Sequence, residues 1–306
     1  MNLSSRRQLV EALIPVIRKA GDSALALKDD DVAVRAKQDG SPVTSADLAS
    51  NDILHAACLA LFPALPVVSE EDGCVFEARK DSDSVLLIDP LDGTKEFIKG
   101  RDEFAVNIAL VENGHASAGL IYAPARDRLF FSYGAGLAFE QTAGGQRRSL
   151  PRPSAPRRPI ALVSRSHLDP RTEALLAALQ PCDIEEIGSS LKFAMVAAAE
   201  ADFYLRLAPT MIWDCAAGQA IIEAAGGVVL QTDGTSLICD CKGKLKLDGF
   251  IAARAAACCT ADCNPAGARN HIRSCNPAIG PWLKALRRPL RSIGRHASRQ
   301  ALYWLR

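Results

Sequence analysis

Two carboxylates and a hydroxyl lie close together along the chain in the segment Asp89–Thr94, which reads Asp-Pro-Leu-Asp-Gly-Thr. The apolar run 85–88 before it predicts a strand buried on both faces, and Asp89 comes where that strand ends. Because the proline restricts the chain direction, Asp89, Asp92 and a backbone carbonyl between them can point to one place. A ligand set made only of oxygen suits a hard cation such as Mg²⁺. The glycine and threonine can begin a helix or turn whose free N–H groups bind phosphate, although an acidic turn that only accepts backbone amides has the same pattern.

Three further acidic positions occur elsewhere in the chain. The strand-like run 67–69 leads into the acidic triplet 70–72, which could equally be a solvated loop. Asp214 begins a run of small residues typical of a packed helix, and Asp47 falls in the first turn of another predicted helix. Taken singly, an acid at either helix start is explained by capping or by the helix dipole. Their occurrence in one chain with the segment 89–94 favours a metal site assembled from several elements.

Helices and strands alternate along the chain and must position these acids. Residues 4–26 and 45–61 have apolar positions at helical spacing, and Thr44 or Ser45 can cap the second helix. A connection rich in proline and arginine, residues 146–159, divides the chain into two halves. The other predicted helices are 170–179, 191–200 and 214–225, and the predicted strands are 32–36, 67–69, 85–88, 104–111, 118–122, 129–133, 137–140, 160–163, 203–207, 228–230 and 250–253.

Composition excludes several classes of protein. Apolar residues make up 48% and charged residues 23% of the 306 residues, as in ordinary globular proteins. No apolar run approaches the roughly 20 residues of a membrane-spanning helix, and the first residues lack the apolar stretch of a signal peptide. We therefore expect a cytoplasmic protein. The ten cysteines favour reduced, buried thiols over a disulfide scaffold, because Cys58, Cys182 and Cys215 lie in apolar or helical runs.

The segment 258–306, which we call the basic tail, differs in charge from the rest of the chain. It contains nine lysine or arginine residues and one acid, Asp262, so the remainder is net acidic. Its four cysteines lack the paired spacing of a zinc site. Leucine and aromatic residues, among them Trp282 and Trp304, alternate with its arginines, as in basic segments that bind anionic lipid or nucleic acid. A disordered extension is the simpler interpretation, and we expect no nucleic acid partner. Peripheral contact of the tail with the cytoplasmic face of the inner membrane stays open.

Three motifs together resemble those of the inositol monophosphatase-like, lithium-sensitive, metal-dependent phosphatases. They are Val-Ser-Glu-Glu at 68–71, the segment 89–94, and Trp-Asp-Cys-Ala-Ala-Gly at 213–218. The motifs stand in the family's order and approximate spacing, and the resemblance extends over about residues 5–256. Further details resemble the 3′(2′),5′-bisphosphate nucleotidases of that family, namely the stretches 95–97, 164–167, 188–193 and 204–210.

The resemblance implies a metal site with oxygen ligands and a small catalytic set. The site would hold two or three Mg²⁺ ions, with ligands from Glu70, Asp89, the carbonyl oxygen of Leu91, Asp92 and Asp214. Glu70 would take the proton of the attacking water and Thr94 would orient that water. Asp47, near a weaker third metal position, would complete the catalytic residues.

The substrate that the resemblance implies is a small bisphosphate nucleotide. The reaction would convert 3′-phosphoadenosine 5′-phosphate to AMP and phosphate, and 3′-phosphoadenylyl sulfate is a further candidate substrate. Lys192 and Arg206 would meet the phosphate that is not cleaved, and His167 and Ser189 would contact the adenosine. The alternatives are solvated surface charges for the two cations and an unliganded loop histidine for His167. The cleaved phosphate would contact Leu91, Asp92, Gly93, Thr94 and Asp214.

Two other functions stay open from the sequence. The same metal site would serve a phosphatase acting on inositol monophosphate or a sugar phosphate. A protein of another class, a catalytically idle nucleotide-binding protein, is disfavoured by the intact set of acids. No P-loop segment is present.

The resemblance predicts the architecture and leaves the assembly open. It implies an α/β fold, in detail a layered α/β/α/β/α sandwich with two sheets. The expected parts are an N-terminal metal- and phosphate-binding subdomain at 1–150, a C-terminal substrate-specificity subdomain at 156–256, and the basic tail. Both a monomer and a homodimer are compatible with the sequence.

Overall fold

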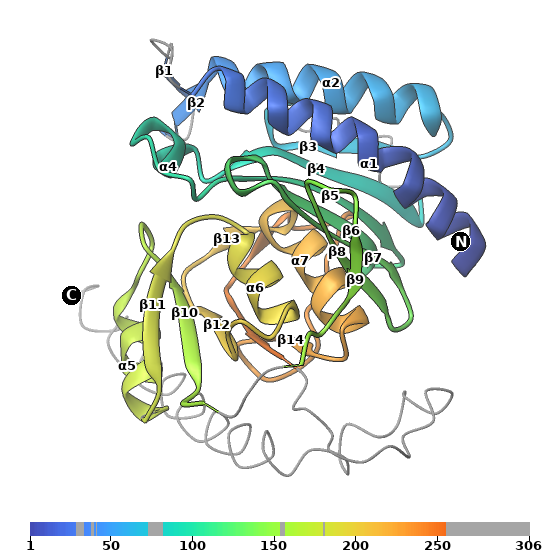
Figure 1. The fold of residues 1–306 in the computed structure, drawn as a ribbon. Coiled ribbons are helices and arrows are strands. Elements are labelled where there is room, and N and C mark those ends of the chain that lie inside the picture. The colour runs from blue at the N-terminus through green and yellow to red at the C-terminus, as the bar shows by residue number, and fades with distance from the viewer. Residues whose placement is uncertain are drawn as a thin grey trace, which may run out of the picture.

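The computed structural model describes residues 1–28, 34–37, 40, 42–72, 82–153, 157–179 and 181–254. Within these residues, layers of helices alternate with a seven-stranded and a five-stranded sheet in the order α/β/α/β/α (Figure 1), and two further sheets have two strands each. The predicted sandwich with two sheets is therefore confirmed. The basic tail, with every prediction made for it, lies outside the described residues.

Two long helices form the first layer. Helix α1 (Leu3–Ala26) is capped by Asn2, whose Oδ1 accepts a hydrogen bond from the amide of Ser5 at 2.9 Å. Helix α2 (Ser45–Leu61) is capped by Thr44, as predicted. A short hairpin of β1 (Val34–Ala36) and β2 (Pro42–Thr44) leads into α2.

A seven-stranded sheet lies under these helices (Figure 1). Its strands follow one another in chain order, and only the first pair is parallel. The consecutive order explains why short turns suffice to connect most of them. The strands are β3 (Val67–Ser69), β4 (Ser84–Asp92), β5 (Ala105–Glu112), β6 (His115–Ala123), β7 (Arg128–Gly134), β8 (Leu137–Thr142) and β9 (Arg147–Ser149).

Alternate residues of this sheet pack into different cores, because successive side chains of a strand point to opposite faces. Leu86 and Ile88 of β4 pack in the core that contains α1 and α2. Val85 and Leu87 of the same strand pack in the core on the other face, which contains the inner helices. The strand is buried on both sides, as its unbroken apolar run predicts.

The inner helices α6 (Leu191–Ala197) and α7 (Ile212–Ala224) separate this sheet from a second one (Figure 1). The second sheet has the strand order β11-β10-β12-β16-β14 and carries α5 (Pro170–Ala178) on its outer face. One core cluster contains residues of both sheets and both inner helices. The two halves of the chain therefore share a core. The strands are β10 (Ile160–Ser164), β11 (Asp183–Ile187), β12 (Phe203–Arg206), β14 (Val228–Gln231) and β16 (Phe250–Ala253).

Several short elements were not predicted. Strand β11 lies at a sheet edge, and four of its five residues are exposed. It was not predicted because its sequence has no apolar alternation. Strand β9 falls inside the predicted connection 146–159, and all three of its residues are exposed. The other unpredicted elements include the 3₁₀ turns η1 (Glu70–Asp72) and η2 (Pro124–Arg126) and the two-residue strands β13 (Thr210–Met211) and β15 (Lys246–Leu247). The short helix α4 (Thr94–Ile98) begins at Thr94, where a helix or turn was expected.

The cysteines agree with the sequence prediction. In the described part of the chain, the five cysteines are buried and none is in a disulfide, namely Cys58, Cys182, Cys215, Cys239 and Cys241. In the same residues, none of the helices combines the length and the apolar character needed to cross a membrane.

Candidate active site

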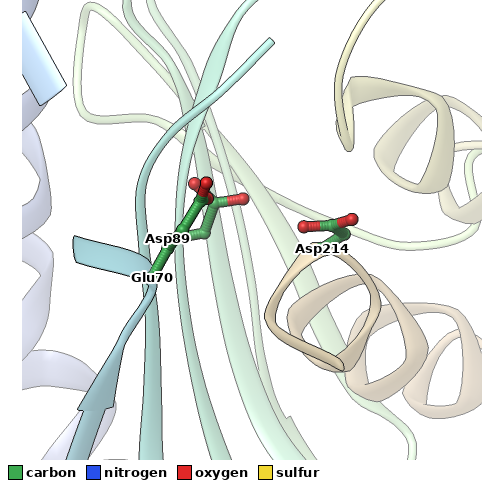
Figure 2. Close-up of side chains that lie close together, drawn as sticks. All are labelled: Glu70, Asp89 and Asp214. Carbon is green, nitrogen blue, oxygen red and sulfur yellow. The ribbon is translucent and has the colours of Figure 1, made fainter. Parts of the chain in front are cut away.

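Three carboxylates from three elements meet between the first sheet and the inner helices. Glu70, Asp89 and Asp214 each offer an oxygen, and these oxygens lie within 4.8 Å of one another. Figure 2 shows Glu70 and Asp89 side by side, with Asp214 facing them from the start of α7. The pairing of β3 with β4 explains the first two positions. The strands are parallel with Ser69 opposite Ile88, so the residues that follow these two are neighbours at one edge.

Asp214 is held by the first turn of α7. The helix begins at Ile212, so Asp214 is its third residue and not the capping residue. One carboxylate oxygen, Oδ2, accepts a hydrogen bond from the amide of Met211 at 3.1 Å and another from the hydroxyl of Thr210. The acid thereby satisfies a backbone donor that the helix leaves open, and this fixes its position opposite Asp89.

The segment 89–94 turns sharply where β4 ends. Asp92 accepts a hydrogen bond from the amide of Ser190, which ties β4 to the loop before α6. Gly93 then adopts a positive φ of 95°, and a Cβ at this position would lie 2.8 Å from the carbonyl oxygen of Glu103. Only glycine satisfies both conditions. The glycine of this motif is therefore required by the backbone.

Thr94 connects the segment 89–94 to α2. Its Oγ1 donates towards Oδ1 of Asp47 at 3.1 Å and towards the carbonyl oxygen of Leu91 at 3.2 Å. The other oxygen of Asp47 accepts hydrogen bonds from the amide of Thr44 at 2.8 Å and from its hydroxyl at 2.5 Å. Asp47 is thus fixed by the helix cap and in turn fixes the Thr94 hydroxyl.

The crowded carboxylates raise one another's pKa values. Burial, followed by the charges of Glu70 and Asp92, raises the pKa of Asp89 well above its ordinary value. Burial and the charge of Asp214 raise the pKa of Glu70 to about 7. The same two causes raise the pKa of Asp92 to about 6. A cluster of this kind gains stability from a bound cation, since a cation offsets the repulsion and replaces lost solvation.

Lys37 already supplies one positive charge to the cluster. Its Nζ lies 2.7 Å from Oε1 of Glu70 and 2.7 Å from Oε1 of Glu71. Burial by itself lowers the pKa of this lysine. The charge of Glu70 and the hydrogen bonds to both glutamates outweigh that effect, so the pKa of Lys37 lies above its ordinary value. The sequence analysis missed Lys37, because a single lysine in a polar turn carries no signal of what it contacts.

A cavity of about 230 Å³ opens beside the carboxylate cluster. Asp89 and Asp47 are not among the residues that line it. Asp89 belongs to the carboxylate cluster and Asp47 contacts Thr94. The other residues for which the sequence predicts a role all line this cavity, namely Glu70, Leu91, Asp92, Gly93, Thr94, His167, Ser189, Lys192, Arg206 and Asp214. The two halves of the chain thus contribute to one cavity, and the individual roles stay predictions.

Lys192 is not a solvated surface charge, because only 1% of the residue is exposed. Its Nζ donates to the carbonyl oxygens of Ile187 at 2.8 Å and Ser189 at 2.6 Å. Burial lowers the pKa of Lys192 to about 8, while the charge of Asp92 opposes this shift. The lysine therefore holds the loop before α6.

Arg206 has a donor available for a ligand. Its Nη2 donates to the carbonyl oxygen of Pro209 at 3.1 Å. Its Nε is buried and makes no hydrogen bond to the described part of the chain. A buried donor without a partner costs free energy. An anionic group in the cavity would supply the missing acceptor.

Several lining residues had no predicted role. They lie in the stretches 95–97, 164–167, 188–193 and 204–210, which carry the resemblance, but no individual role was predicted for them. The lining residues of this kind include Lys95, Glu96, Ser164, Ser190, Tyr204 and Thr210.

A sequence model of the inositol monophosphatase family matches residues 5–266. The chain belongs to the inositol monophosphatase family. The 3′(2′),5′-bisphosphate nucleotidase CysQ of Salmonella typhimurium is 39% identical over 231 residues, which are 75% of this chain and 93% of that protein. The nucleotidase CysQ of Buchnera aphidicola is 36% identical, over 76% of this chain and 87% of that protein.

Solved structures of the family have the same fold. The crystal structure of CysQ from Bacteroides thetaiotaomicron, a bacterial member of the inositol monophosphatase family, is 35% identical with a TM-score of 0.71. The match covers 81% of this chain and 98% of that one. An inositol monophosphatase of Thermotoga maritima, 22% identical with a TM-score of 0.69, matches in fold over 94% of this chain and 99% of that one. The inositol monophosphatase family is metal-dependent, and the donor set Glu70, Asp89 and Asp214 can hold a metal ion.

Proposed function

We propose that the chain is a Mg²⁺-dependent, Li⁺-sensitive phosphatase that hydrolyses 3′-phosphoadenosine 5′-phosphate to AMP and phosphate, with 3′-phosphoadenylyl sulfate as a second substrate. The observation that carries the proposal is the meeting of three carboxylates, from Glu70, Asp89 and Asp214, at a cavity that also contains unpaired positive charge. The CysQ nucleotidases to which the chain is similar support the choice of substrate.

The carboxylate cluster fits Mg²⁺, because Mg²⁺ prefers oxygen ligands and this set is buried and acidic. The ligands would be Glu70, Asp89, Asp214, Asp92 and the carbonyl oxygen of Leu91. Bound there, two or three ions would neutralise the phosphate and lower the pKa of a water molecule.

The residues around the cluster would orient the water and take its proton. The Thr94 hydroxyl has one hydrogen, for which Oδ1 of Asp47 and the carbonyl oxygen of Leu91 are the acceptors, so the lone pairs of Oγ1 would remain available to accept a hydrogen bond from the water. The carboxylate of Glu70, which belongs to the carboxylate cluster, would accept the proton of the water. The backbone amides of Gly93 and Thr94 would bind the oxygens of the cleaved phosphate.

Positively charged side chains in the cavity support a substrate with two anionic groups. Three cations line it, namely Lys95, Lys192 and Arg206. In the described residues none of the three forms an ion pair with a carboxylate. Inositol monophosphate has one phosphate and leaves these charges unmatched, whereas a bisphosphate nucleotide supplies a second anion. Ser189 and His167 line the same cavity and would contact the adenosine.

Phosphate release from a set of phosphomonoesters tests the proposal. We expect the highest kcat/KM with 3′-phosphoadenosine 5′-phosphate, a strict requirement for Mg²⁺, and inhibition by Li⁺. Inositol monophosphate and a sugar phosphate serve as the comparison substrates. Equal or higher kcat/KM on inositol monophosphate would overturn the choice of substrate, and turnover that survives Asp92→Asn or removal of Mg²⁺ would overturn the mechanism.

A further inference from the structure

We infer that Lys95 is a specificity-determining residue that binds the phosphate that is not cleaved, and that the His167 ring positions its ammonium group. The inference rests on the proposed bisphosphate substrate. It assigns to Lys95 the contact that the sequence had suggested for Lys192.

The number of free donors separates the two lysines that line the cavity. An ammonium group has three N–H donors. Lys192 uses two of them on the carbonyl oxygens of Ile187 and Ser189, and its Nζ lies 4.8 Å from the centroid of the Tyr204 ring. Lys95 makes one hydrogen bond, between Nζ and Nε2 of His167 at 3.1 Å. Two donors of Lys95 therefore remain for a ligand.

In the described residues Lys95, like Lys192 and Arg206, forms no ion pair, which distinguishes it from Lys37 and Arg165. Lys37 is paired with two glutamates, and Arg165 is paired with Glu103 at 3.0 Å. Within the part of the chain that the structure describes, no carboxylate lies within 4.0 Å of the Lys95 ammonium. Its positive charge is thus uncompensated by a direct ion pair, and a phosphate oxygen is the ligand that would supply one.

His167 can hold the ammonium group only as an acceptor. Nε2 accepts from Lys95, which leaves the ring hydrogen on Nδ1, 3.4 Å from the hydroxyl oxygen of Ser164. Burial, followed by the charges of Arg206 and Lys95, lowers the pKa of His167 to about 4. The ring is therefore neutral at pH 7 and can accept the hydrogen bond.

The bond between Lys95 and His167 also joins the two halves of the cavity. Lys95 belongs to α4 and directly follows Thr94, the residue proposed to orient the water. His167 lies in the segment that follows β10, in the second half of the chain. Both residues line the cavity. A phosphate bound by Lys95 would therefore fix the substrate relative to the cleaved bond, and it would do so only when the substrate has a second anionic group.

Two nucleotides that share the cleaved ester test this assignment. These are 3′-phosphoadenosine 5′-phosphate and adenosine 3′-monophosphate, which lacks the second phosphate. The variants are Lys95→Met, the charge-preserving Lys95→Arg, and Lys99→Met as a matched control, since Lys99 is an exposed lysine one turn further along the chain. Measurements are kcat/KM in Mg²⁺ and the binding of each nucleotide with Ca²⁺ in place of Mg²⁺.

We expect Lys95→Met to lower kcat/KM and affinity for the bisphosphate by about ten- to a hundredfold, the usual effect of a lost charged hydrogen bond. The values for the monophosphate should stay within about twofold, Lys95→Arg should restore most of the loss, and Lys99→Met should change neither substrate. An equal effect of Lys95→Met on both nucleotides, or an effect on neither, would overturn the inference. Absence of turnover by the unchanged protein would overturn the proposed function, while the binding data would still decide the role of Lys95.

Discussion

The hydroxyl oxygen of Thr94 lies 3.1 Å from Oδ1 of Asp47, which joins the turn after β4 to the first turn of α2. The two oxygens of the Asp47 carboxylate accept hydrogen bonds from different residues. Oδ1 accepts from Thr94, and Oδ2 accepts from the amide and hydroxyl of Thr44. The aspartate that completes a helix cap therefore also directs the hydroxyl proposed to orient the attacking water.

Asp47→Asn tests this double use. Thr44 and Thr94 donate to different oxygens of Asp47. An amide has an acceptor oxygen at only one of these two positions, so asparagine cannot accept from both residues. We expect kcat for the bisphosphate nucleotide to fall by about a hundredfold and the free energy of unfolding to fall by about 1 kcal/mol. Steady-state kinetics and chemical denaturation measure the two effects.

Asp169→Asn is the matched control for that variant. Asp169 caps α5 in a similar way, with one oxygen accepting from the amides of Arg171 and Thr172 and the other from the Thr172 hydroxyl. It does not line the cavity. The control should lose similar stability and keep its kcat. If both variants keep the unchanged kcat, Asp47 has only the capping role.

Proton competition at Glu70 should make Mg²⁺ binding dependent on pH. Burial and the charge of Asp214 raise the pKa of Glu70 to about 7 in the metal-free protein. A carboxylate must be ionised to bind the metal, so protons compete with Mg²⁺ as the pH falls through 7. One such group weakens the apparent affinity by roughly tenfold between pH 8 and pH 6. Titration calorimetry at the two pH values measures this change.

The variant Glu70→Gln provides the comparison, because glutamine does not titrate. Its Mg²⁺ affinity should be weaker at pH 8 and should change less between pH 8 and pH 6. The residual change would come from Asp89, whose pKa is raised by burial, and from Asp92, whose pKa is raised to about 6 by burial and by Asp214. Identical Mg²⁺ affinities of the unchanged protein at the two pH values would contradict the prediction.

Local sequence signals were sufficient where a single element decides the structure. The apolar run before Asp89 predicted a buried strand, and Thr44 was one of the two residues predicted to cap α2. Glu70 was expected after a short strand, and β3 ends directly before it. Each of these features depends on neighbours within a few residues, which is the range over which periodicity and capping act.

Contacts between distant segments could not be predicted from local sequence signals. Nothing in the local sequence indicates that Lys37 lies against Glu70, or that Lys192 is buried with its ammonium on two carbonyl groups. Both depend on how layers pack after they form. Strand β11 was missed for a related reason, since an exposed edge strand of mostly acidic residues has no apolar alternation to recognise.

Asp89→Asn should stabilise the metal-free protein while it abolishes activity. Asp89 is 1% exposed and lies among other carboxylates, so its charge is unfavourable without a cation. The neutral amide relieves this repulsion. We expect the metal-free Tm to rise by about 2 °C, which corresponds to about 1 kcal/mol in a chain of this size. The additional rise in Tm on adding Mg²⁺ should be lost. Thermal unfolding with and without Mg²⁺ measures both.

Asp202→Asn serves as the control, because the charge of Asp202 is stabilised by cations and its removal should destabilise the protein. Asp202 is also buried, but it pairs with Arg157 at 2.5 Å and with Arg254 at 2.5 Å. Removing its charge leaves two arginines without their partner, and a loss of about 3 kcal/mol is expected. A fall in Tm for Asp89→Asn in the metal-free protein would contradict the view that its charge is destabilising there.

The position of Asp214 depends on how closely α7 approaches the first sheet. Gly119 of β6 lies against α7, and a Cβ at this position would be 2.5 Å from the carbonyl oxygen of Ala217 and 2.8 Å from its Cα. Backbone atoms cannot move aside as a side chain can. Gly119→Ala must therefore displace α7 and with it Asp214, which lies in the helical turn before Ala217.

We expect Gly119→Ala to lower the free energy of unfolding by about 2 kcal/mol and to weaken Mg²⁺ binding severalfold, since the carboxylate of Asp214 moves away from Asp89. Gly144→Ala is the control, because a Cβ there meets no atom within 4 Å, and it should leave both quantities nearly unchanged. Denaturant unfolding and Mg²⁺ titration measure them. A loss of stability in Gly119→Ala with unchanged Mg²⁺ affinity would mean that the contact between β6 and α7 does not control the geometry of the carboxylate cluster.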